Sequence, residues 1–239
     1  MRSIKVLIAA PLKQDRHIFA EYQKALDELV IPDGVTVDRF YVVNDCPEII
    51  DDIRGDYIVM NTGDRYDKAV NDHIWTHENL TKMHGLRNAT IERARAGNYD
   101  YWFSIDTDLV LHPLTLKTLL EADKDIVSEI FWTNGWCNGW MCDQASGMRQ
   151  EWHNPGLYEV GMTGALTLVK RKVFEAIDYT PIPNIVAALW GEDRHFCIRA
   201  ACYGFGMWID THYPAEHLYT EQAYQEYMRR RGNGCTNAS

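Results

Sequence analysis

The sequence predicts an α/β fold in which a mostly parallel sheet is flanked by helices within a single domain. Segments with the composition of strands alternate with segments of helical spacing through the first two thirds of the chain, and this order is typical of parallel sheets. The 239 residues suit one large domain, and no repeat or low-complexity linker divides them. Apolar residues make up 46% of the chain, enough for a packed core. We therefore predict one domain over residues 1–220, followed by a C-terminal helix and a loose tail over residues 221–239.

The predicted strands are short runs of β-branched or aromatic residues bounded by turn residues. The first run, residues 4–10, is apolar and ends at Pro11, which is typical of a strand buried on both faces. The second run, residues 35–43, alternates at first and is stopped by Asn44-Asp45-Cys46-Pro47. Together the predicted strands cover residues 4–10, 35–43, 57–60, 99–105, 126–132, 165–169 and 205–210.

The segments between these strands carry the spacing or the end signals of helices. Apolar residues recur at close to helical spacing from Phe19 to Leu29. Gly97 follows the end of the second predicted helix, and Pro113 opens the third. The predicted helices cover residues 18–30, 80–96, 113–120, 172–177, 193–203 and 221–231. Residues 64–77 are expected to form a loop with a possible helix, and residues 134–158 show no clear period.

Charge and composition exclude some classes of function. The net charge of −10 makes non-specific binding of nucleic acid or of an anionic membrane unfavourable, so a phosphorylated substrate would need a local positive group such as a divalent metal ion. The apolar run over residues 6–12 is far shorter than the roughly 20 residues of a membrane span. Six cysteines are few for a disulfide scaffold and are expected to be free thiols. We therefore expect a cytoplasmic protein without a transmembrane segment.

An acidic dyad, Asp106-Thr107-Asp108, follows the strand predicted at residues 99–105. In an extended chain, residues i and i+2 point the same way, so the two carboxylates can converge on one hard cation. The same spacing in Asp123-Lys124-Asp125 lies in a charged connection, where solvation explains it. Carboxylates at the end of a buried strand are costly unless they are paired or bind metal. The alternative for the first dyad is a helix N-terminal cap before Pro113.

Residues 99–111, which read YDYWFSIDTDLVL, resemble the acidic signature of GT-A-fold glycosyltransferases, near family two and the Anp1-like mannosyltransferases. The resemblance implies a GT-A fold, a nucleoside diphosphate sugar as donor and Mn²⁺ or Mg²⁺ as cofactor. It implies that Asp108 binds the metal and that Asp106 binds the metal or the donor ribose. His217, in Pro214-Ala215-Glu216-His217-Leu218, matches the family's late metal-binding histidine, with His212 as its nearest rival.

Other short segments extend the resemblance in order along the chain. The donor's nucleoside would lie against Ala9-Ala10-Pro11 and Asn44-Asp45, with Arg87 as a basic donor contact. Gly164, within Gly161-Met162-Thr163-Gly164-Ala165, matches the acceptor side. Trp190-Gly191-Glu192-Asp193 matches the catalytic acidic motif, which makes Glu192 and Asp193 the candidate catalytic residues.

The chemistry of such a transfer fits these residue types. A bound metal ion can neutralise the charge that builds on the leaving diphosphate. Asp193 would be the general base of an inverting reaction, with a helix cap as its alternative role, and the sequence does not decide between inversion and retention. Trp190 could stack on an acceptor sugar, and Trp136, Trp140 and Trp152 could line the same cleft, although core packing is the ordinary role of tryptophan.

Taken together, these features predict a metal-dependent hexosyltransferase that moves a sugar from a nucleoside diphosphate sugar to an acceptor hydroxyl. Two alternatives stay open. A nucleotidyltransferase acting on a sugar phosphate also uses a carboxylate-bound metal. A catalytically silent sugar- or nucleotide-binding module could keep the same fold.

Overall fold

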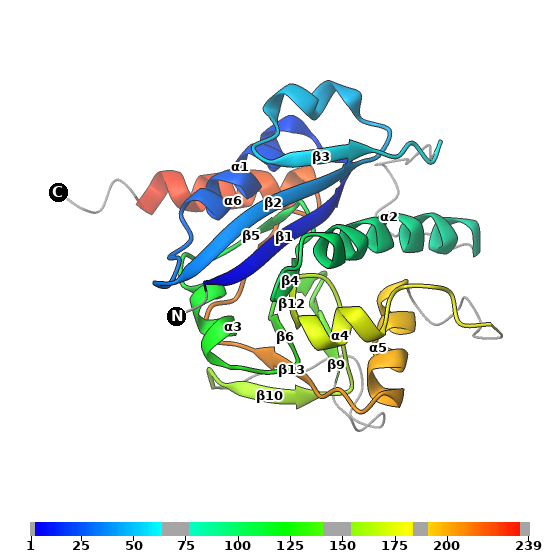
Figure 1. The fold of residues 1–239 in the computed structure, drawn as a ribbon. Helices are drawn as coiled ribbons and strands as arrows, with labels where there is room; N and C mark the ends of the chain where they lie inside the picture. The colour runs from blue at the N-terminus through cyan, green and yellow to red at the C-terminus, as the bar shows by residue number, and fades with distance from the viewer. Residues whose placement is uncertain (1–2, 64–76, 141–153, 184–190, 235–239) are drawn as a thin grey trace.

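The computed structural model describes residues 3–63, 77–140, 154–183 and 191–234. Within these residues, eight strands form a central sheet in the order β10-β13-β6-β12-β4-β1-β2-β3 (Figure 1). Six of them run in one direction, and β10 and β12 run antiparallel to their neighbours. The strands are β1 (Ile4–Leu12), β2 (Val35–Val43), β3 (Asp56–Val59), β4 (Tyr101–Ser104), β6 (Ile126–Glu129), β10 (Leu157–Val160), β12 (Thr167–Lys170) and β13 (Met207–Asp210). The predicted mostly parallel sheet is confirmed.

Helices cover both faces of this sheet. Buried residues of α1 and α3 belong to one apolar cluster and those of α2, α4 and α5 to a second, on the opposite face. The helices are α1 (Arg16–Asp27), α2 (His77–Ala96), α3 (Thr115–Glu121), α4 (Arg171–Ala176), α5 (Asp193–Cys202) and α6 (Glu221–Gly234), with a 3₁₀ helix at Pro47–Asp52. In the described residues, no helix is long and apolar enough to cross a membrane. The predicted single α/β domain is confirmed.

Strand β1 divides the core because its side chains alternate between the two faces. Val6, Ile8 and Ala10 lie in the cluster with α1, whereas Leu7 and Ala9 lie in the cluster with α2. The strand continues through Pro11 to Leu12, beyond the predicted end at residue 10. Its burial from both sides explains why the sequence is apolar rather than alternating.

The C-terminal helix α6 packs on α1. A small third cluster joins Ile18 and Ala25 of α1 to Tyr227 of α6. Arg231 also reaches Glu21, at 2.9 Å between Nη1 and Oε2. The helix predicted over residues 221–231 is therefore part of the packed domain. It continues to Gly234, and the rest of the predicted loose tail, residues 235–239, lies outside the described residues.

In the described residues, three pairs of short strands lie outside the main sheet: β5 (Leu109–Val110) with β14 (Glu216–His217), β7 (Trp132–Thr133) with β8 (Trp136–Cys137), and β9 (Gly139–Trp140) with β11 (Met162–Thr163). Residues 134–158, which show no clear period in the sequence, contain β8, β9 and the start of β10 where the structure describes them. Strands of two residues are too short to show a period, so only their cross-strand partners define them.

Helix α2 ends at Ala96, before Gly97 as predicted, but the residue that closes the helix is the next one. Asn98, not Gly97, takes the left-handed conformation, with φ of 51°. The amides of Asn98 and Tyr99 donate to the carbonyls of Arg95 and Ala94, which closes the helix. Gly97 is needed because a Cβ there would lie 2.2 Å from the Tyr99 ring.

The core predicts a measurable difference between two aromatic truncations. Phe103, on β4, has no exposed surface, so Phe103→Ala is expected to lower the free energy of unfolding by about 3–5 kcal/mol. Tyr57, on the edge strand β3, is 44% exposed, so Tyr57→Ala is expected to change it by less than about 1 kcal/mol. Urea denaturation of both variants measures the difference, and equal losses would contradict this description of the core.

Candidate active site

The acidic dyad lies at the carboxyl edge of the sheet, where ligands bind in folds of this type. Asp106 and Asp108 lie in the turn between β4 and β5, and the Leu109 amide donates to the Asp106 carbonyl at 3.1 Å. The capping alternative for this dyad is wrong, because α3 begins at Thr115 and its N-cap residue is Leu114. The dyad is therefore placed for another role.

Arg87 joins the dyad to the second acidic motif. Its guanidinium, on α2, is 2% exposed and donates from Nη2 to Asp106 Oδ1 at 2.7 Å and from Nε to Glu192 Oε1 at 3.1 Å. Nη1 donates to Ser104 Oγ at 3.2 Å. Burial alone would lower the pKa of Arg87, but the charges of Asp106 and Glu192 raise it well above its ordinary value. These contacts are within the protein, so a donor contact by Arg87 stays a prediction.

His217 lies against the second carboxylate of the dyad. Pairing of β14 with β5 places its Nε2 3.5 Å from Asp108 Oδ2, and Nδ1 lies 2.9 Å from Thr133 Oγ1. Burial lowers the pKa of His217, and the Asp108 carboxylate more than reverses that effect. His212, the rival histidine, instead contacts Asp210 at 3.0 Å.

The donor atoms of Asp108 and His217 suit a divalent cation, because carboxylate oxygen and imidazole nitrogen are both ligands of such ions. Asp106 directs one oxygen to Arg87, and among the described residues no three His, Cys, Asp or Glu side chains are gathered closely enough to hold a metal ion. The three-residue set Asp106, Asp108 and His217 is thus not preassembled. A cation held by one or two protein groups would complete its coordination with substrate phosphate oxygens and water, as Mg²⁺ often does.

Asp193 begins α5 beside Gly164. Tyr179 Oη lies 3.3 Å from Asp193 Oδ1, and a Cβ built on Gly164 would lie 2.8 Å from Oδ2. Burial, followed by the charge of Glu192, raises the pKa of Asp193 to about 7. The N-cap residue of α5 is Glu192, whose side chain makes no capping hydrogen bond. Asp193 is therefore a partly buried carboxyl group that can exchange a proton near neutral pH.

Two residues that the sequence did not single out contact this carboxyl group or the glycine beside it. Tyr179 contacts Asp193 directly, and Asn138 accepts the Gly164 amide proton on its carbonyl at 3.0 Å. The Asn138 side chain also donates to the Glu129 carbonyl at 2.9 Å. Neither residue belongs to a recognisable motif, and their roles follow only from contacts between distant segments.

The predicted nucleoside edge is built from the ends of β1 and β2. Ala10 is buried in the core, and Pro11 lies within β1. Asn44 Oδ1 accepts hydrogen bonds from the amide and the hydroxyl of Thr62, at 3.0 and 2.9 Å. Asp45 has a positive φ of 51° and accepts from the Thr62 hydroxyl at 3.1 Å. Asn44 and Asp45 thus connect the end of β2 to the residues after β3.

The tryptophans predicted to bind an acceptor are in different environments. Trp136, on β8, is 43% exposed. Trp140, on β9, lies under the guanidinium of Arg194, at 4.7 Å from the ring centroid, beside Asp193 in sequence. Trp152 and Trp190 lie outside the described residues.

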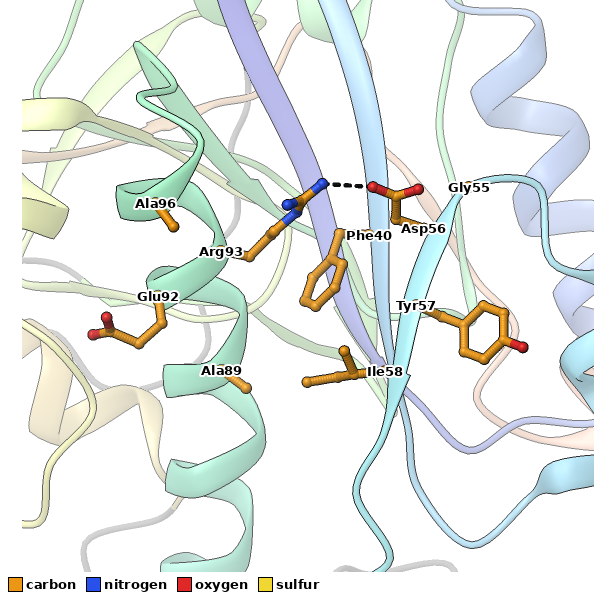
Figure 2. A pocket seen from close by; sticks show the side chains of 9 residues that line it. All are labelled: Phe40, Gly55, Asp56, Tyr57, Ile58, Ala89, Glu92, Arg93 and Ala96. Carbon is orange, nitrogen blue, oxygen red and sulfur yellow. Dashed lines mark hydrogen bonds and ion pairs between the residues drawn. The ribbon is translucent and has the colours of Figure 1, made fainter.

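A separate open groove of about 590 Å³ lies between α2 and strands β2 and β3 (Figure 2). Arg93 and Asp56 bridge it, at 2.5 Å between Nη2 and Oδ2. Figure 2 shows that the Glu92 carboxylate and the Tyr57 ring point away from the gap. None of the predicted site residues lines it.

The Arg87 cluster predicts a non-additive effect on stability. Arg87→Met removes the cation from buried Glu192 and is expected to lower the free energy of unfolding by about 3–5 kcal/mol. The double variant Arg87→Met/Glu192→Gln is expected to lose less than the single variant, since the unpaired buried charge is gone. Urea denaturation of both proteins measures this coupling, and strictly additive losses would contradict it.

No protein-family model matches the chain, and no curated protein matches its sequence. Solved structures do match it. The mannosyltransferase PcManGT from Pyrobaculum calidifontis, in complex with GDP-Man and Mn²⁺, is 13% identical with a TM-score of 0.53, over 96% of this chain and 61% of that one. TarS 1–349 from S. aureus is 14% identical with a TM-score of 0.55, over 99% and 66%. Its complex with UDP-GlcNAc is 13% identical with a TM-score of 0.54, over 88% and 58%. The chain thus spans about three fifths of the length of the structures it matches, and it shares their fold.

Proposed function

We propose that the chain is a glycosyltransferase of GT-A type that moves a sugar from a nucleoside diphosphate sugar to an acceptor hydroxyl with the help of Mn²⁺ or Mg²⁺. The observation that carries the proposal is the convergence of two acidic motifs on one buried cation, Arg87, at the carboxyl edge of the sheet. The shared fold supports it, since PcManGT was solved with GDP-Man and Mn²⁺ and TarS with UDP-GlcNAc. A cytoplasmic location is part of the same proposal.

In this proposal Asp108 and His217 hold the metal ion, and Asp106 binds either the metal or the donor ribose. The bound ion would supply positive charge to the leaving diphosphate. Such a local charge is needed because the chain carries a net charge of −10. The donor's nucleoside would lie along Ala10, Pro11, Asn44 and Asp45.

Asp193 is the proposed general base, with Glu192 beside it fixing Arg87. In an inverting transfer, Asp193 takes the proton of the acceptor hydroxyl as its oxygen bonds to the anomeric carbon, and the bond from that carbon to the diphosphate oxygen breaks. The pKa of about 7 suits this step, because a base near neutrality is both ionised and basic enough to accept a proton. Gly164 leaves room for the carboxylate.

The acceptor would lie between Gly164 and the tryptophans. Trp136 is 43% exposed and is the proposed stacking residue, since aromatic faces suit the apolar side of a sugar ring. Trp140 would act beside Asp193 while stacked under Arg194, and Trp190 precedes the acidic motif in sequence.

A thermal-shift screen tests the proposal. UDP-, GDP- and dTDP-sugars are added with and without Mn²⁺, because a ligand of the folded state raises its apparent stability. We expect one donor to stabilise the protein only with metal. Stabilisation by nucleoside triphosphates alone would favour a nucleotidyltransferase, and no shift with any donor would favour a catalytically silent module.

Matched variants make the screen specific. Asp108→Asn is expected to abolish the metal-dependent shift, whereas Asp123→Asn is the same change in the other dyad, where the carboxylate is exposed and pairs with Lys170. A metal-dependent shift that survives in Asp108→Asn would contradict the proposed metal site.

Asp193→Asn is expected to lower turnover by about 10²–10⁴-fold with donor affinity unchanged, because the amide cannot accept the proton. Turnover of the wild type should rise with pH through the neutral range as Asp193 loses its proton, with a midpoint near the pKa of about 7. Steady-state kinetics across pH measure both effects. Near-normal turnover in Asp193→Asn would exclude this residue as the base.

A further inference from the structure

Two carboxyl groups lie side by side at the carboxyl ends of β6 and β13, outside the proposed reaction. Glu129 and Asp210 are the last residues of these parallel strands and are direct partners in the register. Glu129 is 0% exposed and Asp210 is 2% exposed. Two buried negative charges at this spacing would be strongly unfavourable without compensation.

Among the residues that the structure describes, no cationic side chain pairs with Glu129. Its Oε1 accepts the Ile130 amide at 3.2 Å, and its buried Oε2 accepts no hydrogen bond from the described residues. On the neighbouring strands, the Leu166 carbonyl accepts the Glu129 amide and Leu157 lies opposite Asp210, so neither position is ionisable.

Besides Glu129, Asp210 contacts one titratable side chain among the described residues, that of His212. Asp210 Oδ1 accepts the His212 amide at 2.9 Å and lies 3.0 Å from Nδ1 of the same residue. The imidazole is therefore directed at Asp210 rather than at Glu129. Burial, followed by the charge of Asp210, raises the pKa of Glu129 to about 9, so Glu129 is a neutral acid at neutral pH.

We propose that Glu129 and Asp210 share one proton, and that this pair positions residues 211–218, the segment that carries His217 to the candidate metal site. The Glu129 hydroxyl donates to the Asp210 carboxylate, and the only change on ionisation is loss of that proton to solvent. The role of His217 rests on the proposed function, whereas the shared proton does not.

The connection from the pair to the site is short and hydrogen-bonded at both ends. Asp210 holds the His212 amide, and the Ala215 amide donates to the Ile130 carbonyl, next to Glu129, at 2.9 Å. At the far end, the Leu218 amide donates to the Asp108 carbonyl at 2.8 Å. The segment is thus fixed to the carboxyl pair on one side and to the dyad on the other.

Linkage gives the sign of the effect. The pKa of Glu129 is higher in the folded protein than in water, so the folded segment binds the proton more tightly than the open one. The stabilisation of the folded segment by this proton is complete at acid pH and is lost as pH rises towards about 9, the pKa of Glu129. If the segment opens and exposes the pair, its amide protection should fall by up to about tenfold per pH unit in this range and then level off.

The test compares Glu129→Gln with wild type, because glutamine keeps the shape and the hydrogen-bond donor but cannot titrate. Hydrogen–deuterium exchange of residues 211–218, corrected for intrinsic exchange rates, is measured across pH 5–10, and ¹³C NMR of side-chain carboxyl groups follows the titration. Glu159→Gln is the matched control, since Glu159 is exposed on the neighbouring strand β10.

We expect the wild type and Glu159→Gln to show a carboxyl group that titrates in the alkaline range and a protection that falls with pH. In Glu129→Gln both the titration and the slope should be absent, with full protection retained. Asp210→Asn is the second variant. It removes the charge that, together with burial, raises the pKa of Glu129, so amide protection should level off at a lower pH than in the wild type.

Two results would overturn the proposal: a wild-type slope in Glu129→Gln, or no alkaline carboxyl titration in the wild type. Both measurements are made without a nucleotide sugar. A failed donor screen would therefore contradict the proposed function and leave this pair to be decided by its own data.

Discussion

The buried guanidinium of Arg87 is the interaction on which the candidate site depends. It joins Asp106, which follows β4, to Glu192, which precedes α5, although the two acidic residues are far apart in sequence. Without this cation, several carboxylates would share a poorly solvated edge of the sheet, and their repulsion would oppose the packing of α5 against the core. Helix α2 covers that face of the sheet, and it is the element that brings the required charge to the edge.

The same arrangement gives the two acidic motifs different tasks. Asp106 and Glu192 are bonded to Arg87, so their charges are largely compensated within the protein. Asp108 lies two residues after Asp106 and contacts His217. Asp193 directly follows Glu192 and contacts Tyr179. One member of each motif thus builds the structure, and in the proposed function the other acts on the metal ion or on the proton of the acceptor.

The sequence was sufficient for the helices and for every strand of the main sheet except β10, because long apolar runs and helical spacing are local signals. It could not reveal the short strands β7, β8 and β9, whose partners define them, nor that Asn98 rather than Gly97 takes the left-handed position. The order of the acidic motifs along the chain predicted that the segments around Asp106 and Glu192 lie at one site. The structure adds the contacts of both residues with Arg87. Tyr179, Asn138 and the pair of Glu129 and Asp210 had no signal in the sequence, because a register between distant strands is not written in local spacing.

Two clusters of acids therefore lie at the same edge of the sheet, and they are compensated by different means, the first by Arg87 and the second, in our proposal, by a shared proton. An arginine cannot lose its proton in this pH range, so the charge that fixes Asp106 and Glu192 is constant. A proton shared by two carboxyl groups is reversible, and its loss at alkaline pH would restore the repulsion. The permanent positive charge of Arg87 lies between the two acidic motifs, so the contacts that join them do not depend on protonation of this residue. The titratable pair lies one segment away, and the backbone of residues 211–218 connects it to His217.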